Sequence, residues 1–428
     1  MTDGAGDTPQ APETAVLVAV SLPTTSDEET SESLQELAAL ASTAGAAVAD
    51  RIVQRRNTYD PATLMGSGKV DDVRRAVERS GATLVIFDND LSVTQQDRLT
   101  TMLDARILDR TALILEIFAL HAHTAEGRTQ VELAQLSYLL PRIRGRGIEL
   151  SRISGGIGPM RGPGETKLEV DRRRIRRRMR KLERDMVQME AVRTTQRKQR
   201  TRAGLPSVCL VGYTNSGKSS LLNRLTGSNV LVEDQLFSTL DSTTRRLEMA
   251  GGGTVVLSDT VGFIRKLPHE LVAAFRSTLE VVRDADLLVH VVDSTRAEMI
   301  SERMQAVTDV LADLDAVDIP SLTVFNKWDA LDPAGCLELI AKKPDAIHTS
   351  ALTGEGMEAL AGAISAGVQS VGIVRLRIPA ARGDVIASLH RAGTVIETDL
   401  DGEELLLVAR LPRDRIREYA PFMERDGN

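Results

Sequence analysis

Residues 212–219 carry the clearest chemistry in the chain, because they read Gly-Tyr-Thr-Asn-Ser-Gly-Lys-Ser. They match the pattern G-x-x-x-x-G-K-[ST], in which a glycine-rich turn lets backbone N–H groups curl around a phosphate. Lys218 supplies a cation for the phosphate oxygens, and Ser219 supplies a hydroxyl ligand for Mg²⁺. Apolar residues 208–211 and residues 220–225 predict the preceding strand and the following helix that such a loop requires.

A second stretch, residues 259–262, reads Asp-Thr-Val-Gly and follows the apolar residues 254–257. An aspartate at the end of a strand suits a magnesium site, and we expect Asp259 to hold the ion through water. The Gly262 amide is expected to meet the γ-phosphate of a nucleotide.

Two further stretches could recognise a base. Residues 326–329 read Asn-Lys-Trp-Asp, and Asp329 can accept both the N1 and N2 protons of guanine, which adenine does not offer. Asn326 is expected to support the neighbouring loops, and the stem of Lys327 to pack on the ring. Residues 350–352, Ser-Ala-Leu, then offer a backbone amide to guanine O6. All four stretches in this order predict a guanine-nucleotide site.

A γ-phosphate sensor requires a hydroxyl between the phosphate loop and the Asp-Thr-Val-Gly stretch. Residues 237–241, Phe-Ser-Thr-Leu-Asp, provide the best candidate, with Thr239 binding Mg²⁺ only in the triphosphate state. Thr243 and Thr244 are the competing choices.

The catalytic equipment for hydrolysis is sparse. Many GTPases place a glutamine directly after this glycine to orient water, whereas Phe263 and Ile264 stand here. An apolar side chain cannot orient a nucleophile by hydrogen bonding, so we predict slow intrinsic turnover that a partner accelerates. The predicted catalytic groups are Lys218, Thr239 and Gly262, and the predicted metal ligands are Ser219 and Thr239. The full predicted nucleotide-binding set is Gly212, Tyr213, Thr214, Asn215, Ser216, Gly217, Lys218, Ser219, Phe237, Ser238, Thr239, Leu240, Asp241, Asp259, Thr260, Val261, Gly262, Asn326, Lys327, Trp328, Asp329, Ser350, Ala351 and Leu352.

Residues 66–69, Gly-Ser-Gly-Lys, resemble the end of a second phosphate loop. The upstream glycine is missing at the required spacing, where Ala62 stands, so an ordinary loop at the start of a helix is the favoured interpretation. A second anion site is the alternative.

The elements that position these residues require several domains, and a chain of 428 residues predicts about three. Alternating strand-like and helix-like runs predict an α/β fold: a P-loop GTPase domain at 204–370, preceded by an N-terminal α/β domain at 15–122 and a helical hairpin at 123–203. Residues 371–428 predict a small C-terminal α+β domain, and residues 1–14 a disordered tail. Within the N-terminal domain we expect a largely parallel sheet with strands at 15–20, 46–54 and 82–87 and helices at 33–44, 68–80 and 93–103.

The hairpin prediction depends on helical spacing of apolar residues on both sides of a glycine-rich stretch, residues 145–164. Before it the apolar positions are Leu133, Leu136 and Leu140. After it they are Leu168, Ile175, Met179, Leu182, Met186 and Met189. This spacing predicts a seam between two antiparallel helices.

The same segment holds a concentration of positive charge. Residues 142–202 contain 20 Lys or Arg and 7 Asp or Glu, within a chain of net charge −7. The run from Arg172 to Lys181 covers every helical face except the seam, whereas solvated helix faces usually mix signs. We interpret it as a contact surface for the phosphates of structured RNA, because aromatic residues for base stacking are absent from the loop. A solvated face balanced by acidic domains, and an anionic membrane, are the alternatives.

Composition limits the protein class. The chain is 42% hydrophobic and 26% charged, and no apolar run approaches the roughly 20 residues that cross a bilayer. Its two cysteines, Cys209 and Cys336, cannot form a disulfide framework, so we expect a reduced, cytoplasmic setting without a membrane anchor. A monomer is the simplest expectation.

The chain resembles the HflX family of translation-factor-related GTPases from about residue 15 to residue 422. The resemblance is carried by the stretches at residues 66–70, 129–136, 155–166, 237–241 and 259–263. The apolar residue after Gly262 is itself similar to the family pattern.

The resemblance implies that the protein binds the large (50S) ribosomal subunit and splits stalled or stressed 70S ribosomes. It also implies that the glycine-rich loop of the hairpin contacts 23S rRNA near the peptidyl-transferase centre, and that Thr239 is the switch magnesium ligand. A GTP-dependent rRNA-binding or ribosome-assembly factor without splitting activity is the alternative. Some family members also hydrolyse ATP, which Asp329 does not explain.

Overall fold

The computed structural model describes residues 13–143, 167–202, 205–228, 236–237, 239–249, 253–266, 276–369 and 371–424. By its internal contacts the chain divides into two compact units. The first comprises Met1–Glu190, Asp234–Leu240 and Leu267–Phe275, and the second comprises Ala191–Glu233, Asp241–Lys266 and Arg276–Asn428. No described helix is long and apolar enough to cross a membrane.

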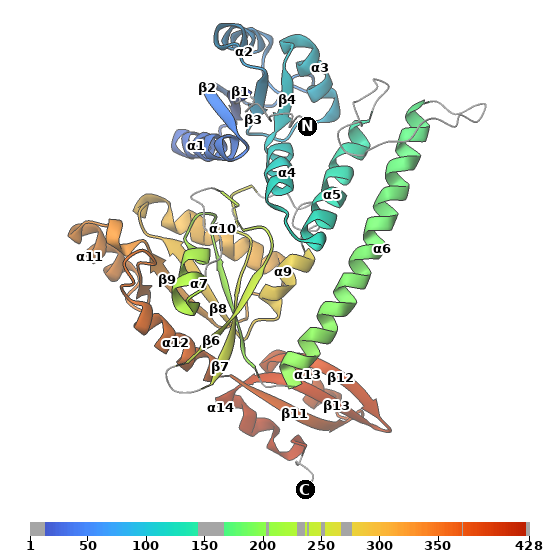
Figure 1. Cartoon of the computed structure of the whole chain (residues 1–428), viewed down its shortest axis with the longest axis vertical. Helices are drawn as coiled ribbons and strands as arrows, with labels where there is room; N and C mark the ends of the chain where they lie inside the picture. The colour runs from blue at the N-terminus through green and yellow to red at the C-terminus, as the bar shows by residue number, and fades with distance from the viewer. Residues whose placement is uncertain are drawn as a thin grey trace, which may run out of the picture. The chain divides into compact units, whose positions relative to one another are not determined.

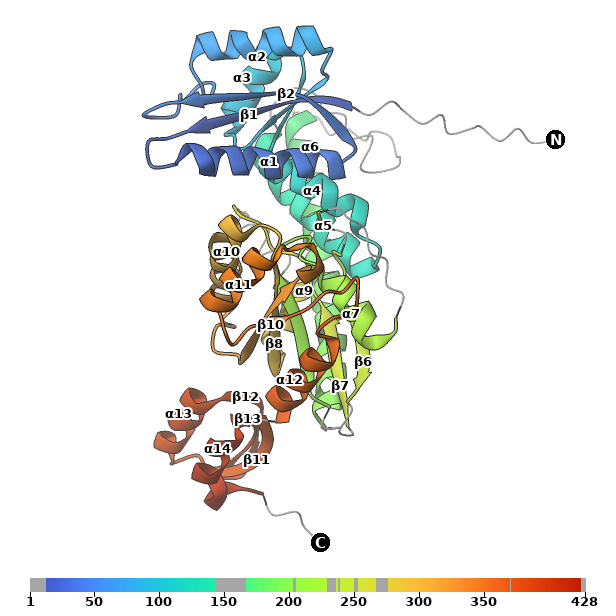
Figure 2. The ribbon, with the colours of Figure 1, turned by 90° about the vertical axis from the view of Figure 1, so that its left-hand side faces the viewer.

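The first unit begins with a four-stranded sheet in the order β2-β1-β3-β4, and all of its strand pairs are parallel. The strands are β1 (Glu13–Ser21), β2 (Ala46–Arg55), β3 (Leu84–Phe87) and β4 (Arg106–Asp109). The helices are α1 (Asp27–Thr43), α2 (Ser67–Ser80), α3 (Val93–Leu103) and α4 (Arg110–His121). Helices α1 and α2 lie on opposite faces of β1 and β2 (Figure 2). The predicted parallel α/β arrangement is therefore confirmed.

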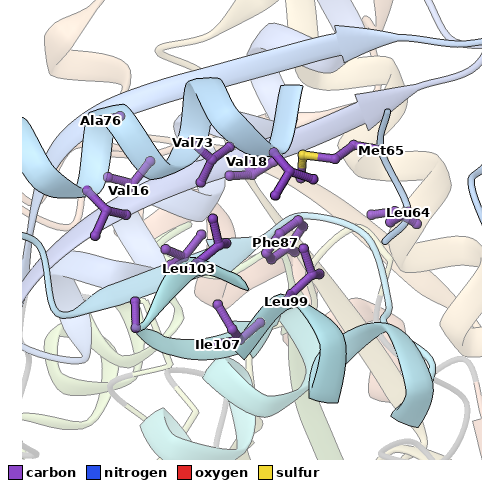
Figure 3. Close-up of a cluster of buried hydrophobic side chains, with 14 of the residues drawn as sticks. Val16, Val18, Leu64, Met65, Val73, Ala76, Phe87, Leu99, Leu103 and Ile107 are labelled. Carbon is purple, nitrogen blue, oxygen red and sulfur yellow. The ribbon is translucent and has the colours of Figure 1, made fainter. Parts of the chain in front are cut away.

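Apolar side chains on one face of this sheet meet α2 and α3 in a buried core. Val16 and Phe87 from the sheet pack with Val73 of α2 and Leu99 of α3 (Figure 3). Each of these four side chains is fully buried. Alternation along β1 sends Val16, Val18 and Val20 into this core, because successive strand residues point to opposite faces.

The start of α1 differs from the prediction, whereas the start of α2 agrees with it to within one residue. Helix α1 begins at Asp27 rather than residue 33, because the Ser26 hydroxyl accepts a hydrogen bond from Glu29 N (3.0 Å) and caps an acidic first turn. Gly66 caps α2 with extended backbone, and Lys69 pairs with Asp72 of the same helix (2.9 Å). Residues 66–69 thus form the ordinary helix start that the sequence favours.

The predicted hairpin seam is confirmed for Leu133, Leu136, Leu140, Ile175, Met179 and Leu182. Helix α5 (Ala125–Leu139) continues into a short 3₁₀ turn (Leu140–Arg142), and the second helix is α6 (Lys167–Arg202). Both helices lie side by side in Figure 1. Leu136, Ile143, Ile175 and Leu182 form one buried cluster, against which Leu133, Leu140 and Met179 also pack. The predicted glycine-rich loop lies outside the described residues.

The second unit contains a six-stranded sheet in the order β10-β9-β8-β5-β7-β6, parallel except for the β6–β7 pair. Its strands are β5 (Ser207–Gly212), β6 (Thr243–Glu248), β7 (Thr254–Asp259), β8 (Leu287–Asp293), β9 (Ser321–Asn326) and β10 (Ile347–His348). Its helices are α7 (Lys218–Thr226), α9 (Arg276–Arg283), α10 (Ile300–Asp313), α11 (Pro333–Lys342) and α12 (Met357–Gln369), with 3₁₀ turns at Ala297–Met299 and Trp328–Ala330.

Helices cover both faces of this sheet. Val291 and Val324 lie in a core with residues of α7 and α12, whereas their neighbours Val292 and Phe325 lie in a second core with Ile300 of α10. Since adjacent strand residues point to opposite faces, the two cores lie on opposite sides of the sheet. This is the doubly wound arrangement predicted for the nucleotide domain, and it brings the carboxyl ends of the parallel strands to one edge.

The last part of the second unit is a three-stranded antiparallel sheet in the order β11-β13-β12. Its elements are β11 (Val371–Pro379), α13 (Gly383–Ala392), β12 (Thr394–Asp401), β13 (Glu404–Pro412), α14 (Arg413–Ile416) and a 3₁₀ helix (Arg417–Phe422), as the sequence predicts. Arg410 of β13 donates to the carbonyl oxygens of Ala285 (2.9 Å) and Asp284 (3.2 Å) and pairs with Asp286 at the start of β8. Burial raises the pKa of Asp286, and the Arg410 charge opposes this rise.

Replacement of Arg110 is expected to destabilise the first unit by about 3–5 kcal/mol, because the change leaves buried carboxylates without their cation. Arg110 is 2% exposed and binds Asp88 (2.7 Å) and Glu36 (2.7 Å). Urea unfolding of Arg110→Ala, followed by hydrogen exchange of β3, measures the loss. Arg79→Ala is the matched control, since the side chain of Arg79 is 74% exposed, and it should cost less than about 1 kcal/mol. Equal losses in both variants would contradict the account.

Candidate nucleotide-binding site

The phosphate loop connects the end of β5 to the start of α7, and its glycines are required by close packing. A Cβ on Gly212 would lie 2.3 Å from the carbonyl oxygen of Val291, and a Cβ on Gly217 would lie 2.2 Å from Nδ2 of Asn326. Gly217 also has a left-handed φ of +90°, and it directly precedes Lys218, the first residue of α7. The loop therefore presents the N-terminus of α7, which favours an anion.

Lys218 is 6% exposed, and its ammonium donates to the carbonyl oxygens of Tyr213 (3.0 Å) and Gly212 (3.3 Å). Burial lowers the pKa of Lys218 to about 8, although the nearby Asp259 charge opposes this shift. The hydroxyl oxygens of Thr214 and Ser216 are buried without a hydrogen-bond partner in the described part of the chain. A buried cation beside such hydroxyls is suited to hold a phosphate group.

Two of the predicted magnesium residues, Ser219 and Asp259, lie together at the ends of the phosphate loop and of β7. The Ser219 hydroxyl donates to a carboxylate oxygen of Asp259 at 2.5 Å, and the two residues are 8% and 0% exposed. Hydroxyl and carboxylate oxygens are the ligands that Mg²⁺ prefers. Protein sites for this ion usually use one or two carboxylates and complete the shell with phosphate and water. The residues present therefore fit Mg²⁺.

The stretch after Asp259 packs directly on the phosphate loop. Thr214 N donates to the Phe263 carbonyl oxygen (2.7 Å), and Phe263 N donates to the Gly212 carbonyl oxygen (3.1 Å). Thr260 is fully buried, and its hydroxyl donates to the carbonyl oxygen of Leu210 (2.8 Å). The Phe263 side chain is 1% exposed, so it packs into the protein interior and does not face solvent.

Asn326 connects the phosphate loop to the predicted base-binding loops. Its Nδ2 donates to the Ser216 carbonyl oxygen (2.9 Å), and its Oδ1 accepts from Ala351 N (3.2 Å). The Ser350 hydroxyl donates to an Asp329 carboxylate oxygen at 2.5 Å. These bonds bring together residues that are up to 135 positions apart in the chain, from Ser216 to Ala351. Asn326 thus bonds to both neighbouring loops, as its predicted supporting role requires.

Two contacts on the base side were not predicted. Asp293 at the end of β8 pairs with the Lys327 ammonium (2.9 Å), and the Trp328 ring stacks on His348 with centroids 4.1 Å apart. The signal available for Asp293 was its place after the apolar strand at residues 287–292. The side chain of Leu352 is 80% exposed, and the role of this residue in binding the base stays a prediction.

The switch candidates fall in different parts of the structure. Thr243 and Thr244 lie in β6, and the Thr244 hydroxyl is 3.0 Å from that of Ser258 on the neighbouring strand. Thr239 lies outside helices and strands and belongs to the first unit. Ser238 lies outside the described residues, and the magnesium role of Thr239 stays a prediction.

A doubly wound sheet with a phosphate loop after its central strand β5, an Asp-Thr-Val-Gly stretch after β7 and an Asn-Lys-Trp-Asp stretch after β9 defines a P-loop GTPase. Comparisons with known proteins agree with this class and narrow it to one family. Family profiles described as "GTP-binding GTPase N-terminal", "GTP-binding GTPase Middle Region" and "50S ribosome-binding GTPase" match residues 31–119, 121–200 and 207–327.

Curated relatives identify the family. The chain is 44% identical to the GTPase HflX of Caldanaerobacter subterraneus subsp. tengcongensis, over 95% of this chain and 94% of the relative. It is also 44% identical to the GTPase HflX of Escherichia coli, over 83% of each chain. The chain therefore belongs to the HflX family of GTPases and is a GTP hydrolase, which confirms the resemblance seen in the sequence. Among solved structures it is similar to SsGBP in complex with GDP, at 25% identity and a TM-score of 0.47, over 83% of this chain and 98% of that one.

Nucleotide binding is expected to take up a proton near pH 8, because a bound phosphate favours the charged form of Lys218 and raises its pKa again. At pH 8 about half of the nucleotide-free molecules carry neutral Lys218, so binding should take up about half a proton. Affinity should be constant below about pH 7 and fall about fivefold from pH 8 to pH 9. Calorimetry in buffers of different ionisation enthalpy measures the uptake, and a value of zero at pH 8 would contradict this coupling.

Proposed function

We propose that this site binds Mg²⁺-GTP through the buried Lys218, which neutralises the β- and γ-phosphate oxygens. Ser219 and Thr239 ligate the ion, and the Gly262 amide meets the γ-phosphate. When bound, Mg²⁺ supplies positive charge that stabilises the phosphoryl oxygens during transfer. Asp329, oriented by the Ser350 hydroxyl, accepts both guanine protons. The support for these roles is the geometry that joins the phosphate loop to the base side through Asn326.

Hydrolysis in this site depends on a partner. Phe263 occupies the position at which many GTPases carry the water-orienting glutamine, and its side chain is buried. A bound partner that orders the catalytic stretch would complete the water-orienting machinery. Turnover by the isolated protein is then slow, and the GTP-bound state persists until the partner is met.

The surface that supports a ribosomal partner is the arginine run of α6. Arg173, Arg174, Arg176, Arg177, Arg180 and Lys181 are exposed, whereas Ile175 and Leu182 are buried in the seam. Arg178 pairs with Glu132 of α5 through two bonds of 2.6 Å, which fixes the orientation of α6 on α5. A run of exposed positive side chains on a helix is suited to bind the phosphates of structured RNA.

From this surface and the ribosome-binding description of the matching GTPase family, we infer the function. The protein binds the large (50S) ribosomal subunit through 23S rRNA in its GTP state and dissociates stalled or stressed 70S ribosomes. Hydrolysis then releases it. It acts as a monomer in the cytoplasm. The second candidate function, binding to an rRNA precursor during ribosome assembly, uses the same arginine run and the same switch but does not dissociate ribosomes.

Sedimentation of intact ribosomes with a non-hydrolysable GTP analogue tests the function. We expect the 70S peak to decrease in the presence of the protein, and purified 50S subunits to raise GTP turnover by about tenfold or more. An unchanged 70S peak with co-sedimenting protein would instead favour the assembly function. Arg176→Glu with Arg177→Glu should abolish the effect. The matched control is Arg75→Glu with Arg79→Glu, a pair of exposed arginines on α2, and it should retain the effect.

Asp329→Asn is expected to weaken GDP binding by about 10- to 100-fold, because a charged acceptor for the two guanine protons is lost. The amide of the variant can donate to the carbonyl oxygen that xanthine carries in place of the guanine amino group, so binding of XDP should improve. Competition binding with both nucleotides measures the change. Asp332→Asn is the control, since Asp332 accepts from Gly335 N (2.9 Å) at the start of α11. Unchanged GDP affinity in Asp329→Asn would exclude Asp329 as the guanine acceptor.

A further inference from the structure

Tyr213 connects the phosphate loop to the catalytic stretch that follows β7. The residue is 5% exposed, although it occupies a variable position of the phosphate-loop pattern. Its hydroxyl accepts a hydrogen bond from the backbone N–H of Arg265 at 2.8 Å. The tyrosine thus holds the backbone three residues beyond Gly262.

Phe263, which follows Gly262, is held against the phosphate loop by backbone hydrogen bonds. Phe263 and Tyr213 form a parallel bridge, in which Phe263 N donates to the Gly212 carbonyl oxygen (3.1 Å) and its carbonyl oxygen accepts from Thr214 N (2.7 Å). Together with the tyrosine hydroxyl, three hydrogen bonds attach residues 263–265 to the phosphate loop.

Gly262 directly precedes residues 263–265. Because those residues are attached to the phosphate loop, the position of Gly262 is fixed as well. A Cβ on Gly262 would lie 2.7 Å from Cα of Thr214 and 3.1 Å from Nζ of Lys218. The glycine backbone therefore lies against the loop and next to the phosphate-binding ammonium. A shift of the turn away from the loop would move the Gly262 amide away from this ammonium.

Helix α10 fixes the tyrosine from the other side. The Arg303 guanidinium lies over the Tyr213 ring, 5.0 Å from its centroid, and the Arg265 guanidinium binds Glu302 at 2.8 Å. A cation over an aromatic face stabilises the ring in one orientation. Both partners of the hydroxyl–amide bond are thus held by consecutive residues of one helix.

We propose that Tyr213 is a positioning residue that presents the Gly262 amide to the γ-phosphate and thereby sets the preference of the site for GTP over GDP. The inference rests on the γ-phosphate role of Gly262 in the proposed function. GDP lacks the γ-phosphate, so the hydroxyl of Tyr213 contributes to GTP affinity and not to GDP affinity. If the hydroxyl only satisfied a buried backbone amide, its loss would change the affinity for both nucleotides alike.

Tyr213→Phe tests the proposal, because it removes the hydroxyl and keeps the ring under Arg303. Loss of one buried hydrogen bond is expected to weaken binding of a non-hydrolysable GTP analogue by about fivefold. GDP affinity should change by less than about twofold. Hydrogen exchange at residues 263–265 should become faster in the nucleotide-free variant, which shows that the turn has been released.

Tyr419→Phe is the matched control. Tyr419 is a 2% exposed tyrosine whose hydroxyl is 3.1 Å from that of Ser388, in the C-terminal part of the chain. It should leave both affinities and the exchange at 263–265 unchanged. Equal weakening of both nucleotides by Tyr213→Phe, or no weakening of either, overturns the proposal. Lys218→Ala separates this inference from the proposed function on which it rests. Tight binding of both nucleotides by Lys218→Ala would overturn the proposed nucleotide site. Abolished binding would support that site, and Tyr213→Phe alone would then decide the role of Tyr213.

Discussion

The nucleotide site depends on Asn326, whose single amide group bonds to the phosphate loop on one side and to residues 350–352 on the other. Because Gly217 has no side chain, the amide can approach the loop at a distance that any Cβ would block. The phosphate and base regions therefore behave as one connected structure. A displacement of the carboxyl end of β9, where Asn326 lies, would therefore change the positions of both the phosphate loop and residues 350–352.

Two buried charged groups, Lys218 and Asp259, lie in the phosphate-binding part of the site. Lys218 is buried beside carbonyl oxygens, and its lowered pKa shows that the surrounding protein stabilises the cation poorly. Asp259 is buried beside the Ser219 hydroxyl, and its charge also lies near that of Lys218. In the proposed function, a bound phosphate and a divalent ion would add further counter-charges to these two groups. In the proposed function, binding energy is thereby concentrated on the phosphates, whereas Asp329 supplies the base selectivity.

Much of the site was predictable because its motifs are local. The glycines and lysine of residues 212–219 act within one turn, so their spacing alone indicates the geometry. Contacts between distant parts of the chain were not predictable in this way. Arg110 binds Asp88, 22 residues away, and the pairing of Asp293 with Lys327 requires the sheet order. The early start of α1 was also missed. It depends on the Ser26 cap, and the polar residues that follow Ser26 do not show the apolar spacing from which a helix is predicted.

The bond network of Arg410 has a consequence for the order of synthesis. Asp286 accepts from Ser207 N (2.7 Å) at the first residue of β5, yet its cation is more than a hundred residues downstream. Until residue 410 has left the ribosome that makes the chain, Asp286 has no Arg410 cation beside it, and its bond to Ser207 N must form without that charge. This ion pair is therefore completed only after almost the whole protein has been translated.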